Sequence, residues 1–209
     1  HLAGITVSEI HGCTVRGSDI TIEAEESYAG GLIGSGDGTI IETSKVCADD
    51  NVVNADSMPV IELVSASKGY AGGIAGALTT ANGAGLLGET VGLVQVQEYE
   101  ATDLSTSVRQ VEAEKGDYAG GAFGLLTGGE VDHVSVGAIE TVTANNYAGG
   151  FVGRSGVGSL VDAKGLDILG LGAVEVGNLV SIGNLTSVDI KHSAVTGKDL
   201  TVSATGNTR

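Results

Sequence analysis

Side chains that could carry out chemistry are few and are scattered along the 209 residues of this sequence. Its four histidines are His1, His11, His133 and His192. A catalytic histidine needs a partner at hydrogen-bond distance, and no G-x-S-x-G turn, H-E-x-x-H pair or Cys–His combination is present. His11, His133 and His192 fall near corresponding positions of repeated units, which favours surface or column-filling roles. We therefore predict no catalytic residue.

Acidic side chains gather in two short stretches. "CADDNVVNAD" contains Asp49, Asp50 and Asp56, and "EVDH" contains Glu130 and Asp132. In glycan-active enzymes, such groups bind calcium or perform acid–base catalysis. Neither stretch has the spacing of a calcium loop, and tryptophan, a common platform in sugar clefts, is absent. Solvated turns are the favoured interpretation, so we expect no metal and no cofactor, and any ligand-binding residues stay unassigned.

Cys13 and Cys47 are the only cysteines, and they lack both C-x-x-C spacing and a nearby histidine pair. A disulfide would require adjacent strands to bring them together. The repeat alignment puts them at different positions of the unit, which weighs against pairing without excluding it.

Composition narrows the class of protein. The net charge of −16 argues against binding to nucleic acid or to anionic lipid. No run reaches the roughly 18 apolar residues of a membrane helix, so membrane insertion is not expected. The 35 glycines, one proline and abundant Val, Ile and Thr are typical of β-strands joined by tight turns.

One phrase, Tyr-Ala-Gly-Gly-x-x-Gly, occurs four times, starting at Tyr28, Tyr70, Tyr118 and Tyr147. Each copy follows an alternating segment and a short polar link; the paired apolar residues of these segments are Ile22/Ala24, Val64/Ala66, Val111/Ala113 and Val142/Ala144. The pattern predicts a strand, a corner, and a second strand whose glycines permit close backbone approach. The tyrosines then form either a structural ladder over the corner, the favoured interpretation, or a flat Tyr/Gly strip that binds a ligand.

Further repeats support this unit. "IHGCTVRGSDITIEA" (10–24) matches "IKHSAVTGKDLTVSA" (190–204) without gaps, and "GSGDGTIIETSKV" (34–46) matches "GLLTGGEVDHVSV" (124–136). The tyrosines are separated by 42, 48 and 29 residues, which suggests two coils of roughly 21 to 24 residues in each long interval. Equivalent residues of a parallel β-helix stack about 4.8 Å apart, so like residues form columns. We predict an all-β, right-handed parallel β-helix (β-solenoid) of roughly nine coils with irregular loop insertions, forming one domain over residues 1–209.

At "YAGGLIGSGDGTI" and "YAGGFVGRSGVGSL" the sequence resembles the GLUG-motif family, glycine-rich repeats of large bacterial surface proteins that also occur beside IgA-cleaving metallopeptidases. The resemblance covers Gly30 to Gly34 and the equivalent stretches after the other tyrosines. The copy after Tyr70 departs from the motif as it continues. The resemblance implies export, a bacterial cell-surface location with signal and anchor outside this chain, and a β-helical shape, and it carries no catalytic residues.

We therefore expect a non-enzymatic, structural or adhesive module that acts as a spacer or as a ligand-presenting stalk. Its expected partners are a host or cell-surface glycan or protein and neighbouring repeats or domains of the same chain. Two alternatives remain: a polysaccharide lyase or glycoside hydrolase on the same fold, and an accessory region of a surface peptidase. A groove with three or more converging carboxylates would favour the enzyme.

Two structural expectations can be checked directly. The equivalent apolar positions Ile22, Val64, Val111, Val142 and Val202 should point into one core. The C-terminal "LTVSATGNTR" reproduces the strand and polar link and stops where the other units continue with the tyrosine phrase, so we expect a segment of a longer array. The alternative is that residues 205–209 fold over the last coil as a cap.

Overall fold

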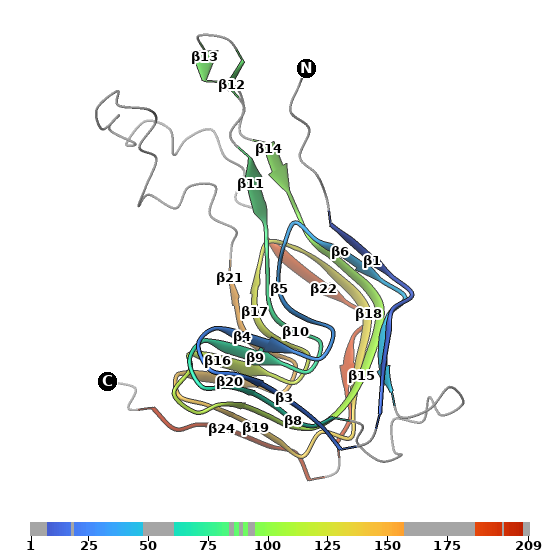
Figure 1. Ribbon diagram of the computed structural model, residues 1–209, viewed down its shortest axis with the longest axis vertical. Helices are drawn as coiled ribbons and strands as arrows, with labels where there is room; N and C mark the ends of the chain where they lie inside the picture. Colours follow the sequence, from blue (N-terminus) through green and yellow to red (C-terminus); the bar gives the residue numbers. More distant parts are fainter. Residues whose placement is uncertain are drawn as a thin grey trace.

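The structure is a computed structural model that describes residues 8–17, 19–47, 61–83, 86–87, 90–91, 95–156, 187–197 and 199–206. This part of the chain is built from β-strands and contains no helix, so all-β architecture is confirmed (Figure 1). It accordingly offers no helix long and apolar enough to cross a membrane.

The strands follow one another in coils, each coil being one passage of the chain around the layers. The first coil comprises β1 (Glu9–His11), β2 (Thr14–Arg16), β3 (Ile20–Ala24), β4 (Tyr28–Gly30) and β5 (Ile33–Asp37). The second comprises β6 (Ile40–Glu42), β7 (Lys45–Cys47), β8 (Ile61–Ala66), β9 (Tyr70–Gly72) and β10 (Ala75–Thr79). The third comprises β15 (Glu100–Ala113), β16 (Tyr118–Gly120) and β17 (Phe123–Thr127).

The fourth coil comprises β18 (Gly129–Gly137), β19 (Thr141–Ala144), β20 (Tyr147–Gly149) and β21 (Val152–Gly156), and a fifth begins with β22 (Val188–Lys191), β23 (Ala194–Val195) and β24 (Thr201–Ala204). Between the second and third coils, two short antiparallel pairs project from the layers in Figure 1: β11 (Ala81–Gly83) with β14 (Gln95–Gln97), and β12 (Leu86–Leu87) with β13 (Thr90–Val91).

Strands of successive coils pair in parallel and in register. The orders are β1-β6-β15-β18-β22, β3-β8-β15-β19-β24, β4-β9-β16-β20 and β5-β10-β17-β21. Because each strand bonds to its own counterpart in the next coil, equivalent residues form continuous columns. This arrangement is consistent with the β-solenoid that the repeats predicted.

The number of coils differs from the prediction. Tyr28 pairs with Tyr70, Tyr70 with Tyr118 and Tyr118 with Tyr147, so neighbouring tyrosine phrases are one coil apart. The shortest spacing, 29 residues, is thus an uninterrupted coil, and the longer ones contain extra chain within a coil. Nine coils are not confirmed: the described residues form four coils and part of a fifth.

Four of the five residues in the apolar column behave as the sequence predicted. Ile22 pairs with Val64, Val64 with Val111, Val111 with Val142, and Val142 with Val202. The three central valines are fully buried, Ile22 is half-buried, and Val202 is 42% exposed. Inward direction is therefore confirmed for Ile22 and the three valines, which form or pack against the core, whereas Val202 is exposed and its predicted burial is not confirmed. The first and last described coils each lack a described neighbour on one side.

The C-terminal residues continue the stacking. The Thr205 amide donates to the Ala144 carbonyl at 2.8 Å and the Gly206 amide to the Asn145 carbonyl at 2.6 Å. These two residues therefore lie along the fourth coil. The rest of the cap considered from the sequence, residues 207–209, lies outside the described part.

The two adjacent glycines of the tyrosine phrase are required for different reasons. In every coil, a Cβ on the first glycine would lie about 2 Å from the carbonyl oxygen three residues later, as between Gly120 and Phe123. A Cβ on the second would instead strike the next coil, as between Gly73 and the Gly121 carbonyl oxygen at 2.3 Å. The first glycine makes the corner and also lies against the next coil, since a Cβ on Gly120 would be 2.5 Å from the Gly153 nitrogen. The second glycine lets adjacent coils approach closely.

Candidate functional site

A bend in the first sheet positions the most concentrated group of chemically active side chains. In each coil one residue at this bend has a left-handed backbone; these residues are Gly12 (φ 60°), Thr43 (49°), Asp103 (53°), His133 (51°) and His192 (44°). The flanking registers place all five in one column. Because the left-handed region turns the chain sharply, this column forms a corner whose side chains face outward.

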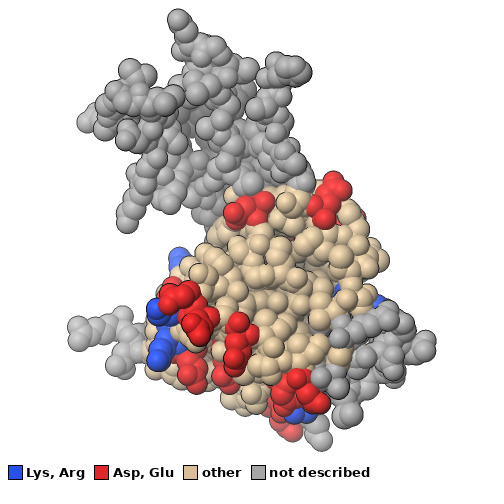
Figure 2. Space-filling view, viewed as in Figure 1, with Lys and Arg blue, Asp and Glu red and all other residues tan. Residues whose placement is uncertain are grey.

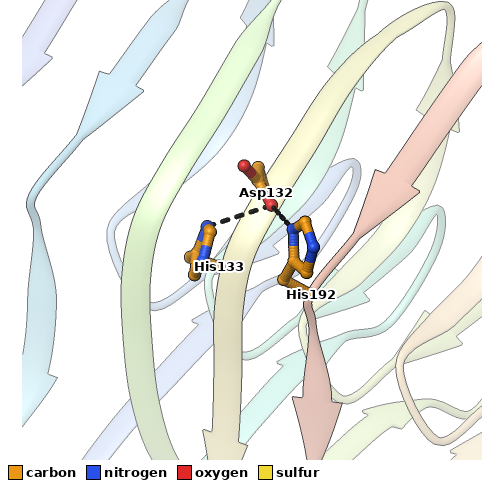
Figure 3. A group of neighbouring side chains, drawn as sticks. All are labelled: Asp132, His133 and His192. Carbon is orange, nitrogen blue, oxygen red and sulfur yellow. Dashed lines mark hydrogen bonds and ion pairs between the residues drawn. The ribbon is translucent and has the colours of Figure 1, made fainter.

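Two histidines and an aspartate meet at this corner, and we call Asp132, His133 and His192 the histidine corner (Figure 3). One oxygen of Asp132, Oδ1, lies 3.0 Å from His133 Nδ1 and 2.8 Å from His192 Nδ1. The imidazole rings stack with centroids 4.8 Å apart and planes 24° apart. Asp132 and His133 lie on β18, whereas His192 directly follows β22, so two coils contribute to the group.

The histidine corner is accessible. The side chain of Asp132 is 24% exposed, that of His133 58% and that of His192 66%. Hydrogen bonds from His192, and secondly from His133, hold the pKa of the Asp132 carboxyl below its ordinary value. The carboxylate thus stays ionised and can accept hydrogen bonds or bind a cation.

Neighbouring charges are neutralised locally. Lys191 Nζ lies 2.8 Å from Asp189 and 3.1 Å from Glu130, and these hydrogen bonds raise the pKa of Lys191. Glu130, one of the acidic residues singled out in the sequence, is therefore paired with a lysine. The other acidic stretch, with Asp49, Asp50 and Asp56, lies outside the described residues.

The remaining histidines and cysteines lie elsewhere. His11 occupies the column of Asp132, one position before the bend, and its ring nitrogens lie 3.3 Å from Glu9 and 3.1 Å from Glu42. His1 is outside the described residues. The Cys13 thiol is free, and the register sets Cys47 opposite Arg16, so the disulfide left open by the sequence is not formed by Cys13.

The second repeated surface is a tyrosine ladder, formed by Tyr28, Tyr70, Tyr118 and Tyr147. Successive ring centroids are 5.2, 4.7 and 5.5 Å apart, and the central pair is nearly parallel at 13°. Arg154 adds a hydrogen bond to the Tyr118 hydroxyl and lies over the rings of Tyr118 and Tyr147 at 5.2 and 5.9 Å.

Stacking determines what the tyrosine ladder can do. The outer rings of Tyr28 and Tyr147 are 42% and 51% exposed, whereas Tyr118 is only 9% exposed. Because inner faces cover one another, the ladder does not present the row of open ring faces that sugar stacking requires. The geometry favours the structural interpretation of the tyrosines over a flat binding strip.

Charges on the face seen in Figure 2 occur in separate acidic groups, with basic side chains beside some of them. Within the described part of the chain, only the histidine corner gathers three or more His, Cys, Asp or Glu side chains so that they could hold a metal ion; its ligand atoms lie within 4.8 Å of one another. It contains one carboxylate, so the three converging carboxylates expected of a glycan-active cleft are not found among these residues.

The sequence singled out Asp132, His133 and His192, and it put both histidines near corresponding positions of repeated units, but it did not predict that the three side chains meet. His133 and His192 are 59 residues apart, and no single alignment of repeats placed them together. Two alignments together would have done so. The alignment of 34–46 with 124–136 matches Thr43 to His133, and that of 10–24 with 190–204 matches Gly12 to His192. The register pairs Gly12 with Thr43 and so links the two. The signal for that register is weak, because the first two coils share little beyond Ile10/Ile41 and Val15/Val46 at this corner.

Comparison of the chain with protein-family models, with curated proteins and with solved structures gave no match.

Proposed function

We propose that this chain is a non-catalytic module of an exported bacterial surface protein, a right-handed parallel β-helix (β-solenoid) that serves as a spacer or ligand-presenting stalk. The observation that carries the proposal is the tyrosine ladder. Each repeated tyrosine contacts its own counterpart in the next coil, and the second glycine accommodates the neighbouring backbone. The backbone contact of the second glycine holds for Gly31, Gly73 and Gly121, whereas a Cβ on Gly150 would meet only the Leu200 side chain. In the first three phrases the repeat thus serves coil-on-coil stacking, which a spacer needs along its length.

Charge supports a role away from nucleic acid. The net charge of −16 repels phosphate backbones and keeps neighbouring copies apart on a crowded surface. The proposed partners are a glycan or protein of the host or cell surface, together with adjoining repeats of the same chain. No insertion into the membrane is proposed.

The proposed location depends on the resemblance of the tyrosine-glycine phrases to GLUG-motif repeats. It can be tested with an antibody raised against this chain and applied to intact and permeabilised cells of the source organism. We expect labelling of intact cells that disappears after protease treatment of the cell surface, with a cytosolic protein as the control. Labelling that requires permeabilisation would contradict the surface location.

The non-catalytic role needs a separate experiment. The purified chain is incubated with acidic and neutral polysaccharides while unsaturated products and new reducing ends are measured. We expect no turnover above that of the heat-unfolded chain. Turnover that is lost in Asp132→Asn would replace this proposal with the glycan-active alternative, because Asp132 is the carboxylate held against two histidines.

A further inference from the structure

We propose that the histidine corner is a binding site for a divalent transition-metal ion, represented by Zn²⁺, and that the bound ion fastens the fifth coil to the fourth. The site would take two imidazole nitrogens and one carboxylate oxygen from the chain and complete its coordination with water. This inference concerns residues that the proposed stalk function does not use.

The donor set selects the class of ion. Imidazole nitrogen and carboxylate oxygen are ligands of Zn²⁺, Ni²⁺, Co²⁺ and Cu²⁺, whereas Ca²⁺ and Mg²⁺ prefer sites made of oxygen. Both histidines direct Nδ1 at the same Asp132 oxygen (Figure 3). An ion replacing the two N–H protons would therefore meet three convergent donors.

The distances fit an ion after a small adjustment. Metal–ligand bonds to nitrogen and oxygen are about 2.0–2.2 Å, so two donors at a tetrahedral angle on one ion lie roughly 3.3–3.6 Å apart. The Nδ1–Oδ1 distances are 3.0 and 2.8 Å, and all three ligand atoms lie within 4.8 Å of one another. To bind one ion, the Nδ1–Oδ1 edges must lengthen by roughly 0.3–0.8 Å, and the two stacked imidazoles, which are largely exposed, must turn so that both ring planes contain the ion.

The backbone already holds the ligands on adjacent coils. Asp132 pairs with Lys191, which sets His192 beside His133 at the left-handed corner. The chain reaches β22 only after the 31 residues that separate it from the end of β21, and most side chains of β22 and β24 are exposed. A metal bridge between the coils would therefore stabilise the coil with the least burial.

The test is calorimetric titration of Zn²⁺ into the full, untagged chain after removal of metals with a chelator. His133→Asn and His192→Asn are suitable variants because asparagine tolerates the left-handed backbone while it removes the imidazole. His11→Asn is the matched control: His11 is an exposed histidine beside two carboxylates but without a second imidazole. We expect one ion per chain, and binding at least about tenfold weaker in either corner variant and unchanged in the control.

Two further measurements separate a bridge from incidental binding. Co²⁺ should give d–d absorption bands that disappear in His192→Asn. Zn²⁺ should slow hydrogen exchange of residues 188–204 in the parent chain and in His11→Asn but not in His192→Asn. Binding in His192→Asn and His133→Asn that is as strong as in the parent chain would overturn the site. Binding that weakens as expected but leaves the exchange of residues 188–204 unchanged would overturn the fastening role.

Discussion

Gly121 and Gly150 occupy the same position of the tyrosine phrase in consecutive coils but have different surroundings. A Cβ on Gly121 would lie 2.1 Å from the Gly150 carbonyl oxygen, because the fourth coil stacks directly against it. A Cβ on Gly150 would meet only Leu200 Cδ2, at an ordinary 3.5 Å. Neither residue has a positive φ, so alanine suits both backbones. The substitutions Gly121→Ala and Gly150→Ala therefore isolate the effect of the neighbouring coil.

The cost of Gly121→Ala follows from the overlap. A carbon and a carbonyl oxygen approach to about 3.3 Å, so the coils would have to separate locally by roughly 1 Å. That movement breaks two nearby backbone hydrogen bonds, Gly121 to Gly149 at 3.3 Å and Ala122 to Phe151 at 2.9 Å, each worth about 1 kcal/mol. Overpacking strain adds about 1–3 kcal/mol, and alanine recovers about 0.4–1 kcal/mol through the unfolded chain.

We expect Gly121→Ala to lower the free energy of unfolding by about 2–5 kcal/mol and Gly150→Ala to change it by less than about 1 kcal/mol in the stabilising direction. Urea unfolding followed by far-UV circular dichroism at 25 °C measures both, provided that the slope of each transition matches that of the parent chain. Equal losses in the two variants, or no loss in Gly121→Ala, would refute the explanation of the second glycine by coil stacking.

Three other perturbations are informative. Val142→Asp should lower the free energy of unfolding by several kcal/mol, because it places a carboxylate at a fully buried position. Val202→Asp, in the same column but at a position that is 42% exposed, should lower it by less than about 1 kcal/mol. Urea unfolding measures both. Burial raises the pKa of Tyr99, whose hydroxyl has no hydrogen-bond partner in the described part. The stability that depends on the neutral hydroxyl is therefore complete below about pH 10 and is lost at higher pH. Tyr99→Phe should shift the midpoint of alkaline unfolding to higher pH, and an unchanged midpoint would count against this. Because the pKa of Asp132 is lowered in the folded chain, its ionised carboxylate contributes stability above about pH 4, and this stability is lost as pH falls. The difference in unfolding temperature between the parent chain and Asp132→Asn should therefore shrink towards pH 2. A difference that grows would contradict the hydrogen bonds assigned to Asp132.

Much of the fold could be predicted from residues because a parallel stack repeats the same environment in each coil. A column that is apolar in one coil is apolar in the next, so Val64, Val111 and Val142 announce their shared burial by their shared place in the phrase. The same logic predicted the strand, corner and strand of every tyrosine unit. At these positions the same residue type recurs because each coil offers it the same surroundings.

Coil length could not be predicted because insertions lengthen a coil without altering its register. The 42- and 48-residue intervals look like two coils each. However, each tyrosine pairs directly with the tyrosine of the next phrase, so each interval is a single coil. Insertions such as the antiparallel pairs that follow β10 leave the columns undisturbed. Only the pairing of strands distinguishes a long coil from two short ones.

The sequence by itself determined the layers, the corners and the apolar columns of this protein, since each depends on residue type at a repeated position. Tertiary structure alone decided the histidine corner. Asp132 and His192 are 60 residues apart and belong to different coils, and they meet because parallel pairing aligns β22 with β18. The hydrophobic pattern fixes register where a face is buried, but His133 and His192 lie on an exposed corner next to coils of unequal length, so the repeats did not show which exposed residues meet.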